Sequence, residues 1–287
     1  MAKIAFTKMH GAGNDYIYVN CLDGLTFDPC ALAIEMSPRH FSVGSDGLVL
    51  IMKSDVADAR MRMFNADGSE GKMCGNAIRC VGKYLSDGGF VTKDVMTIET
   101  LSGIKTLRLT KEKGVVTQAS VEMGRAIFTT KDVPAVYPSD EMVNAPVEVL
   151  GKTYRMTAVS MGNPHAVIFT KGVKELDLAK MGPSFEYLSI FPERVNTEFV
   201  EVLSDRELIM RVWERGSGET FACGTGASAT VAAAVKNGIC KADTDVTVRL
   251  IGGDLVIRVD KEYAVTMTGG ATKVYEGVYE YDENQSK

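Results

Sequence analysis

The 287-residue chain is 45% hydrophobic and 24% charged, a composition typical of a globular protein that can bury one large core or two modest ones. Its net charge of −5 argues against a nucleic-acid-binding protein, which would present a basic face. No apolar run approaches the roughly 18 residues that span a bilayer, and the N-terminus lacks a signal-peptide pattern, so we expect a cytosolic protein with no membrane partner.

In chain order, most of the sequence is predicted to form short strands, because β-branched or alternating apolar residues recur along it. The expected strands are residues 48–52, 60–64, 95–100, 105–110, 115–123, 157–161, 166–169, 198–203, 208–214, 245–250 and 255–259.

Few helices are expected between these strands. Two have defined ends, over residues 75–87 and 226–238, since each stops at a glycine. Shorter helical turns are expected near 29–37 and 174–182. The polar, proline-containing segment 129–146 is predicted to be a connector or a loose surface segment.

Two cysteines have the same unusual setting. Cys74 and Cys223 each follow a glycine-containing turn, precede a glycine and lead into a predicted helix. Asn14 lies 74 − 14 = 60 residues before the first cysteine, and Asn163 lies 223 − 163 = 60 residues before the second. This common offset of 149 residues predicts two similar domains, although sequence identity between the halves is sparse.

The setting of these cysteines suggests proton-transfer chemistry. A cysteine ahead of a helix lies near unpaired N–H groups and the positive end of the helix dipole, which lowers a thiol pKa. The same N–H groups can hold a carboxylate. Two such halves facing each other could place one α-carbon between two thiols, which suits racemisation or epimerisation without an electron-sink cofactor.

The remaining cysteines carry no such signal. No C-x-x-C pair occurs and the histidines are scattered, so neither a disulfide framework nor a zinc site is expected. We expect small buried hydrophobic side chains at Cys21, Cys30, Cys80 and Cys240.

Long ordered segments resemble the diaminopimelate epimerase family, from residue 4 to about residue 278. The segments are 9-MHGAGNDY-16, 64-FNADGSEGKMCGNAIRC-80, 161-MGNPHAV-167, 196-NTEFVEV-202 and 211-RVWERGSGETFACGTGASA-229. The resemblance implies an α/β (α+β) fold of two pseudo-symmetric domains, each a curled mixed β-sheet around a central helix, with the active site in the interdomain cleft. It implies one half at 1–124 plus 269–287 and another at 125–268, with the last strand, near 270–280, returning to the first half.

The resemblance also implies an activity. The family interconverts LL- and meso-2,6-diaminopimelate without cofactor or metal, on the route to lysine and peptidoglycan precursors, and its members suggest a cytoplasmic homodimer. Cys74 and Cys223 map to the acid/base pair. The implied substrate-binding positions are Asn14, Asn65, Gly75, Asn76, Asn163, Asn196, Glu214, Arg215, Gly224 and Thr225. His165 and Glu214 map to positions that flank the reacting centre.

Within the implied site, Gly75, Asn76, Gly224 and Thr225 are expected to bind the reacting carboxylate through backbone groups. Arg215 can fork onto the distal carboxylate, and asparagines suit a zwitterion because they both donate and accept. The sequence departs from some family members at Gly47, where they carry a glutamine, so any contact there has to be made by the backbone.

Three other functions remain open. A proline-racemase-like enzyme also uses paired cysteines, but the polar set that includes Asn65, Asn196 and Arg215 would have no partner on proline. A thiol–disulfide redox protein could use the same two cysteines. A non-catalytic amino-acid binding protein is the third, and it would not exchange the α-proton of its ligand.

Overall fold

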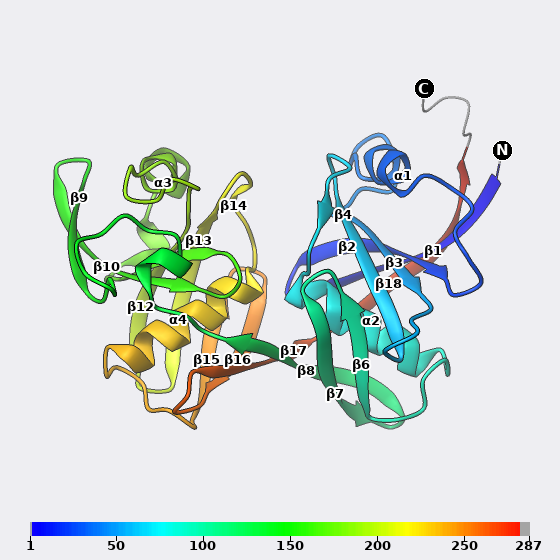
Figure 1. The fold of residues 1–287 in the computed structure, drawn as a ribbon. Coiled ribbons are helices and arrows are strands. Elements are labelled where there is room, and N and C mark those ends of the chain that lie inside the picture. Colours follow the sequence, from blue (N-terminus) through cyan, green and yellow to red (C-terminus); the bar gives the residue numbers. More distant parts are fainter. Residues whose placement is uncertain (1, 282–287) are drawn as a thin grey trace. The chain divides into compact units, whose positions relative to one another are not determined.

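The structure of the chain is a computed structural model, which describes residues 2–281 (Figure 1). It divides into two compact units, unit 1 (Met1–Val121 with Gly269–Lys287) and unit 2 (Glu122–Thr268). Residue 1 and residues 282–287, which the predicted first half includes, lie outside the described part of the chain.

Unit 1 contains a mixed sheet and two α-helices. Its strands pair in the order β18–β1–β2–β3–β4–β6–β7–β8, and the β2/β3 and β4/β6 pairs are parallel while the others are antiparallel. The elements are β1 (Ala2–Gly11), β2 (Asn14–Cys21), α1 (Pro29–Met36), β3 (Gly47–Met52), β4 (Ala59–Asn65), β5 (Glu70–Gly71), α2 (Gly75–Asp87), β6 (Val95–Thr100), β7 (Gly103–Glu112), β8 (Val115–Arg125) and β18 (Thr272–Tyr281). The predicted return of the last strand is confirmed, because β18 runs antiparallel to β1.

Unit 2 repeats this arrangement. Its strands pair in the order β9–β10–β11–β12–β13–β15–β16–β17, again with two parallel pairs, β11/β12 and β13/β15. The elements are η1 (Thr130–Asp132), β9 (Ala145–Val149), β10 (Lys152–Ser160), β11 (Pro164–Phe169), η2 (Val173–Glu175), α3 (Leu178–Glu186), β12 (Asn196–Ser204), β13 (Glu207–Glu214), β14 (Gly218–Glu219), α4 (Gly224–Lys236), β15 (Asp245–Leu250), β16 (Gly253–Val259) and β17 (Ala264–Gly270).

The repeat extends to individual side chains. Helices α1 and α3 begin at residues 29 and 178, and α2 and α4 begin at 75 and 224, so each pair is offset by 149 residues. Arg62 grips Glu70 through Nε and Nη2 at 2.7 and 3.0 Å, and Arg211 grips Glu219 in the same way at 2.7 and 3.0 Å. The predicted pair of pseudo-symmetric units is therefore confirmed.

One helix in each unit is surrounded by its own sheet. Helix α2 packs against β1, β2 and β7, and α4 packs against β10, β11, β12, β15 and β16. Residues 226–234 of α4 are all buried, and none has a side chain larger than valine. Small side chains let the surrounding strands approach the helix closely, which is why an alanine-rich segment serves as a central helix here.

Three sequence-based expectations need correction. The helix expected at 174–182 begins at Leu178, because the Asp177 carboxylate caps it by accepting from Lys180 N at 3.2 Å. Segment 129–146 is not loose, since Val133 and Met142 are fully buried in the core of unit 2. Cys30 is exposed, because it lies in the first turn of α1 and its helix buries the opposite face.

None of the helices in residues 2–281 is long and apolar enough to cross a membrane.

A glycine in α3 gives a test of the packing in unit 2. A Cβ at Gly182 would lie 2.2 Å from Cδ2 of Trp213, whose indole is held by a 2.8 Å hydrogen bond from Nε1 to Glu186. Gly182→Ala gains helix propensity of about 1 kcal/mol, but it overpacks a rigid ring. We expect a net loss of about 2 kcal/mol in the free energy of unfolding, measured by urea denaturation. The exposed control Lys180→Ala should change it by less than about 0.5 kcal/mol, and a stabilised Gly182→Ala would contradict the packing argument.

Candidate active site

Cys74 lies at the N-cap of α2, after the short strand β5. Its backbone is extended, with φ −129° and ψ 122°, and its side chain makes no capping bond to the helix. The thiol instead donates to Oδ1 of Asn14 at 3.2 Å. Asn14 begins β2 directly after the hairpin turn at Ala12 and Gly13, where φ is 53° and 78°. The helix start and the hairpin together place an amide beside the half-buried sulfur.

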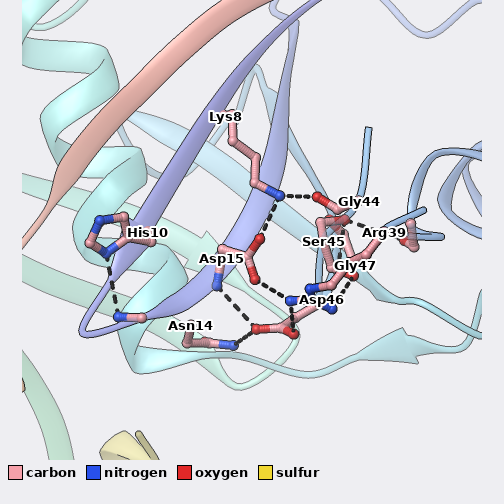
Figure 2. Close-up of polar contacts among 11 residues, drawn as sticks. Lys8, His10, Asn14, Asp15, Arg39, Gly44, Ser45, Asp46 and Gly47 are labelled. Carbon is pink, nitrogen blue, oxygen red and sulfur yellow. Dashed lines mark hydrogen bonds and ion pairs between the residues drawn. The ribbon is translucent and has the colours of Figure 1, made fainter. Parts of the chain in front are cut away.

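A network of charged groups fixes the orientation of that amide (Figure 2). The Asp46 carboxylate accepts from Asn14 Nδ2 at 2.7 Å and from the Asp15 backbone N at 3.0 Å. Arg39 bridges Asp46 and Asp15 at 2.9 and 2.5 Å, and Lys8 pairs with Asp15 at 2.5 Å. Because the NH₂ of Asn14 is held by Asp46, its carbonyl oxygen faces Cys74 and can only accept from the thiol.

A buried arginine supports the first turn of α2. Arg79 is fully buried, and it donates to Asn76 Oδ1 at 3.0 Å, to the Gly75 carbonyl at 3.1 Å and to the Gly270 carbonyl at 3.2 Å. Burial lowers the pKa of this guanidinium from its ordinary value. A Cβ at Gly11 would lie 2.9 Å from Arg79 Nη2, so β1 passes directly over the guanidinium. Arg79 therefore holds the two residues that open α2.

Two further predicted residues of unit 1, Gly47 and Asn65, lie opposite each other on β3 and β4. Asn65 is exposed and donates to Ser69 Oγ at 2.9 Å. Gly47 has φ 156°, and a Cβ there would lie 2.0 Å from the Phe64 carbonyl oxygen, so this backbone excludes a larger residue. Both the N–H and the carbonyl of Gly47 already bond to Ser45 Oγ, at 3.2 and 2.9 Å.

Cys223 occupies the corresponding N-cap of α4 but in a different environment. Its backbone is again extended, at φ −115° and ψ 110°, and the residue is only 6% exposed. The sulfur accepts from Gly226 N at 3.3 Å and lies 3.4 Å from the Thr225 hydroxyl. Cys223 thus has a backbone donor and a hydroxyl beside it, together with a hydrogen bond to the Glu214 carboxylate, whereas the Cys74 thiol faces the Asn14 carbonyl.

The pKa of Cys223 corrects a sequence-based expectation. Burial, followed by the negative charges of Glu214 and Glu198, raises it well above the ordinary thiol value. The bonds from Thr225 and Gly226 act in the lowering direction but do not reverse this shift. The helix dipole alone was expected to lower the pKa. Burial also raises the pKa of Glu214, whose Oε1 accepts from the Thr220 hydroxyl.

The other predicted polar residues of unit 2 cluster around β11 and β12. His165 is fully buried, with Nδ1 at 2.7 Å from Glu198 Oε1 and Nε2 at 3.0 Å from Asn163 Oδ1. Asn163 in turn donates to Thr225 Oγ1 at 3.4 Å. The structure thus joins Asn163, His165 and Thr225 to Cys223 in one bonded cluster.

Asn196 and Arg215 form a separate contact in unit 2. Asn196 is buried, donates to the Pro164 carbonyl at 2.8 Å and accepts from Arg215 N at 3.0 Å. The Arg215 guanidinium donates to the Glu193 carbonyl at 2.9 Å. Since both ends of the Asn196 amide are bonded to backbone, its side chain positions Arg215 in this structure.

The sequence was compared with protein-family models and with known proteins. The chain matches the family model "Diaminopimelate epimerase" over residues 6–129 and 157–274. It is 52% identical to a diaminopimelate epimerase of Acetivibrio thermocellus, across 97% of this chain and 99% of the relative. It is 53% identical to one of Desulfovibrio desulfuricans, across 96% of this chain and 98% of the relative.

The chain belongs to the diaminopimelate epimerase family. Solved structures of more distant proteins share its fold. A PhzF-family phenazine biosynthesis protein from Bacillus anthracis has a TM-score of 0.73 at 18% identity, covering 98% of this chain and all of that one. A probable proline racemase from Agrobacterium radiobacter has a TM-score of 0.71 at 15% identity, covering 97% and 93% of the two chains. These likenesses confirm the fold that the family resemblance predicted.

Reasoning from the sequence did not predict three residues that contact the candidate site. They are Asp46, Arg79 and Glu198. Arg79 and Glu198 lie inside quoted segments, and Asp46 binds Asn14, which lies in another. The signal for Arg79 and Glu198 was a charged residue among apolar neighbours of a predicted helix or strand, where an unpaired charge is costly. Asp46 gave no such signal, because an aspartate in the sequence Gly-Ser-Asp-Gly is typical of a turn.

The orientation of Asn14 can be tested through the reactivity of Cys74. Asp46→Ala frees the Asn14 amide to turn and to donate to a Cys74 thiolate, so alkylation of Cys74 by iodoacetamide near pH 7 should become about three- to tenfold faster. The rate is measured by mass spectrometry of the Cys74 peptide. The exposed control Asp23→Ala should leave it unchanged. An unchanged rate in Asp46→Ala would show that Asp46 does not determine the orientation of the Asn14 amide.

The raised pKa of Cys223 gives a second test. The charge of Glu214 disfavours the thiolate, so its removal in Glu214→Gln lowers the Cys223 pKa and moves the pH profile of Cys223 alkylation to lower pH. At a fixed pH below that pKa, alkylation should be about tenfold faster, which corresponds to about one pKa unit. The exposed control Glu193→Gln should follow the wild-type profile. A profile shifted to higher pH in Glu214→Gln would contradict the electrostatic cause.

Proposed function

We propose that the chain is a diaminopimelate epimerase, which interconverts LL- and meso-2,6-diaminopimelate without a cofactor, in the synthesis of lysine and peptidoglycan precursors. The observation that carries this proposal is the repeated placement of a cysteine at the N-cap of a buried helix, in a chain about half identical to diaminopimelate epimerases over nearly its whole length. Two equivalent thiol sites on one chain suit a reaction that takes a proton from one face of a carbon and returns one to the other.

In the proposed mechanism, Cys74 and Cys223 act on opposite faces of one α-carbon. One sulfur, as thiolate, takes the α-proton, and the C–H electron pair moves into the adjacent carboxylate. The other sulfur, as thiol, then gives its proton to the opposite face of the same carbon. Each turnover therefore leaves the first sulfur protonated and the second ionised, and the reverse reaction restores the starting state. This requires the two units to bring both cysteines to one substrate.

The carbanion needs donors for its carboxylate. We assign this role to backbone N–H groups at the starts of α2 and α4, contributed by Gly75, Asn76, Gly224 and Thr225. Helix N-termini favour an anion through unpaired N–H groups and the helix dipole. A donor set that is in place before the reaction stabilises charge that develops in the transition state. The support for Asn76 is that Arg79 already holds its side chain at 3.0 Å.

The distal amino-carboxylate end needs a second set of groups. We assign Arg215 to the distal carboxylate, and we propose that polar side chains hold the amino groups and complete the pocket. These are Asn14, Asn65, Asn163, Asn196 and Glu214, with His165 and Gly47 in supporting positions. The bond from Arg215 N to Asn196 supports a positioning role for that asparagine.

The remaining assignments follow the family. We propose that residues 1–124 with 269–287 form the half that carries Cys74, that residues 125–268 form the half that carries Cys223, and that the substrate binds in the cleft between the halves. We further propose a cytoplasmic homodimer that binds neither nucleic acid nor membrane. Exposed apolar side chains on β18, at Val274, Tyr275 and Val278, offer a surface that a second copy could cover.

The proposal is tested by α-proton exchange. Reduced wild-type protein, Cys74→Ala and Cys223→Ala are each incubated with LL-diaminopimelate in deuterated buffer, and exchange is followed by NMR. Wild type should form meso product with deuterium at one α-carbon. The rate of epimerisation should fall by at least about 10³-fold in each variant, because the missing thiol leaves one face of the α-carbon without a group that transfers a proton.

The outcomes separate the alternatives. Exchange on proline in place of diaminopimelate would indicate a racemase of the same fold. Binding without any exchange would indicate a non-catalytic protein. Full activity of a form with Cys74 and Cys223 oxidised would rule out acid/base roles for both thiols.

A further inference from the structure

Glu198 is a buried carboxylate to which the proposed mechanism gives no role. It lies on β12, and its side chain, like that of His165, has 0% exposure. Its Oε1 lies 2.7 Å from His165 Nδ1, while Oε2 has no hydrogen-bond partner among the described residues. A carboxylate with one bare buried oxygen destabilises a fold, so its presence beside the site calls for a reason.

Glu198 lies against the helix that carries Cys223. A Cβ at Gly226 would be 2.7 Å from Glu198 Oε1, so the carboxylate occupies the space next to the first turn of α4. The glycine is required there because any larger residue would push the carboxylate or the helix aside. Glu198 and the N-terminus of α4 are therefore in direct contact.

From Glu198, a chain of hydrogen bonds leads to the sulfur. His165 Nε2 lies 3.0 Å from Asn163 Oδ1, Asn163 Nδ2 lies 3.4 Å from Thr225 Oγ1, and that oxygen lies 3.4 Å from Cys223 Sγ. Both groups that face the imidazole ring, the Glu198 carboxylate and the Asn163 carbonyl, can only accept. The ring is held between these two groups, so its orientation depends on Glu198, and the Asn163 amide keeps its carbonyl toward the ring.

The direction of donation follows from the ring. With its carbonyl bound to His165, Asn163 presents its NH₂ to Thr225, and the Thr225 hydroxyl accepts it. The hydroxyl hydrogen is then free to point at Cys223. We propose that Glu198 is a positioning residue, which fixes the His165 ring so that Asn163 keeps its carbonyl toward the ring and its NH₂ toward Thr225, and thereby directs the Thr225 hydroxyl as a donor onto Cys223. This inference rests on the proposed role of Cys223 in proton transfer.

The repeat shows that this chain of hydrogen bonds from Glu198 to Cys223 is present in unit 2 alone, among the residues that the structure describes. At the offset of 149 residues, Glu198 corresponds to Val49 and His165 to Tyr16. In unit 1 a carboxylate acts on the asparagine directly, since Asp46 binds Asn14 Nδ2 at 2.7 Å and turns the carbonyl toward Cys74. The Glu198 chain turns the NH₂ of Asn163 toward the Cys223 side. The two asparagines thus direct opposite ends of their amides toward the two cysteines.

A simpler role for Glu198 predicts the opposite experimental sign. The ionisable groups around Cys223 are Glu198, Glu214 and His165. If Glu198 acted through its charge alone, neutralising it would favour the thiolate and speed alkylation of Cys223. In the proposed chain, Glu198→Gln removes the carboxylate that fixes the His165 ring, so the Asn163 amide can turn over and its carbonyl then accepts from the Thr225 hydroxyl. Cys223 then loses a donor and its alkylation slows.

The test measures alkylation of Cys223 by iodoacetamide in the reduced full-length chain, from about pH 6 to about pH 10, by mass spectrometry of its peptide. Glu198→Gln should slow it about tenfold and move the profile up by about one pH unit, the effect of one lost hydrogen bond to a charged group. The control Glu201→Gln, on the same strand, should match wild type. A rate equal to or faster than wild type in Glu198→Gln would overturn the proposal.

A second variant keeps the proposal testable whatever the stability of Glu198→Gln. Thr225→Val removes the final donor, so it should slow Cys223 alkylation by the same factor, and the double variant should be no slower than Thr225→Val alone. An unchanged rate in Thr225→Val, or additive effects in the double variant, would contradict the proposed chain of hydrogen bonds from Glu198 to Cys223. The exchange assay with diaminopimelate is run on the same samples. A wild type that exchanges nothing overturns the proposed function, while the alkylation profiles still decide the role of Glu198.

Discussion

Everything at the candidate site depends on a cysteine that ends an extended segment and begins a buried helix. At that position the sulfur lies beside backbone N–H groups that the helix cannot satisfy internally, and these are the groups an anionic substrate needs. The constraint is geometric, since the strand, the turn and the helix all have to end within a few residues of each other. The sheet that surrounds α2 or α4 holds this junction in place, which explains why the helix is buried on nearly all sides.

The two units share this framework but differ in the polar groups placed on it. Strand order, helix starts and the Arg62–Glu70 and Arg211–Glu219 pairs repeat at one offset, so the scaffold has been preserved as a unit. Around Cys74 the polar groups include an ion-pair network near the surface, whereas Cys223 is enclosed with two carboxylates that raise its pKa. A two-face proton transfer does not need identical thiols, because the substrate itself is asymmetric about the reacting carbon.

Much of this arrangement could be predicted from the sequence, because glycine and cysteine positions mark the turns and helix starts in both halves. The spacing of Asn14 and Asn163 from their cysteines predicts the repeat, and the helix predicted over 75–87 agrees with α2 at both ends. The electrostatics could not be predicted in this way. The thiol pKa at Cys223 depends on burial and then on Glu214 and Glu198, which lie on β13 and β12, and local reasoning from the helix dipole predicts the wrong direction. The prediction of a loose segment over 129–146 was wrong for a similar reason, since its few apolar residues pack into a core built from distant strands.

The pairing of β1 with β18 also determines when each unit can be completed during synthesis. Unit 2 is one continuous stretch, so all of its strands are synthesised before β18. β1 is the first strand to be made, yet it waits for a partner more than two hundred residues later, a closure of high contact order. Until then β1 has β2 on one side and an unpaired edge on the other, which is the kind of edge that misfolded chains share. A late-closing first half thus makes the newly made chain depend on its last strand.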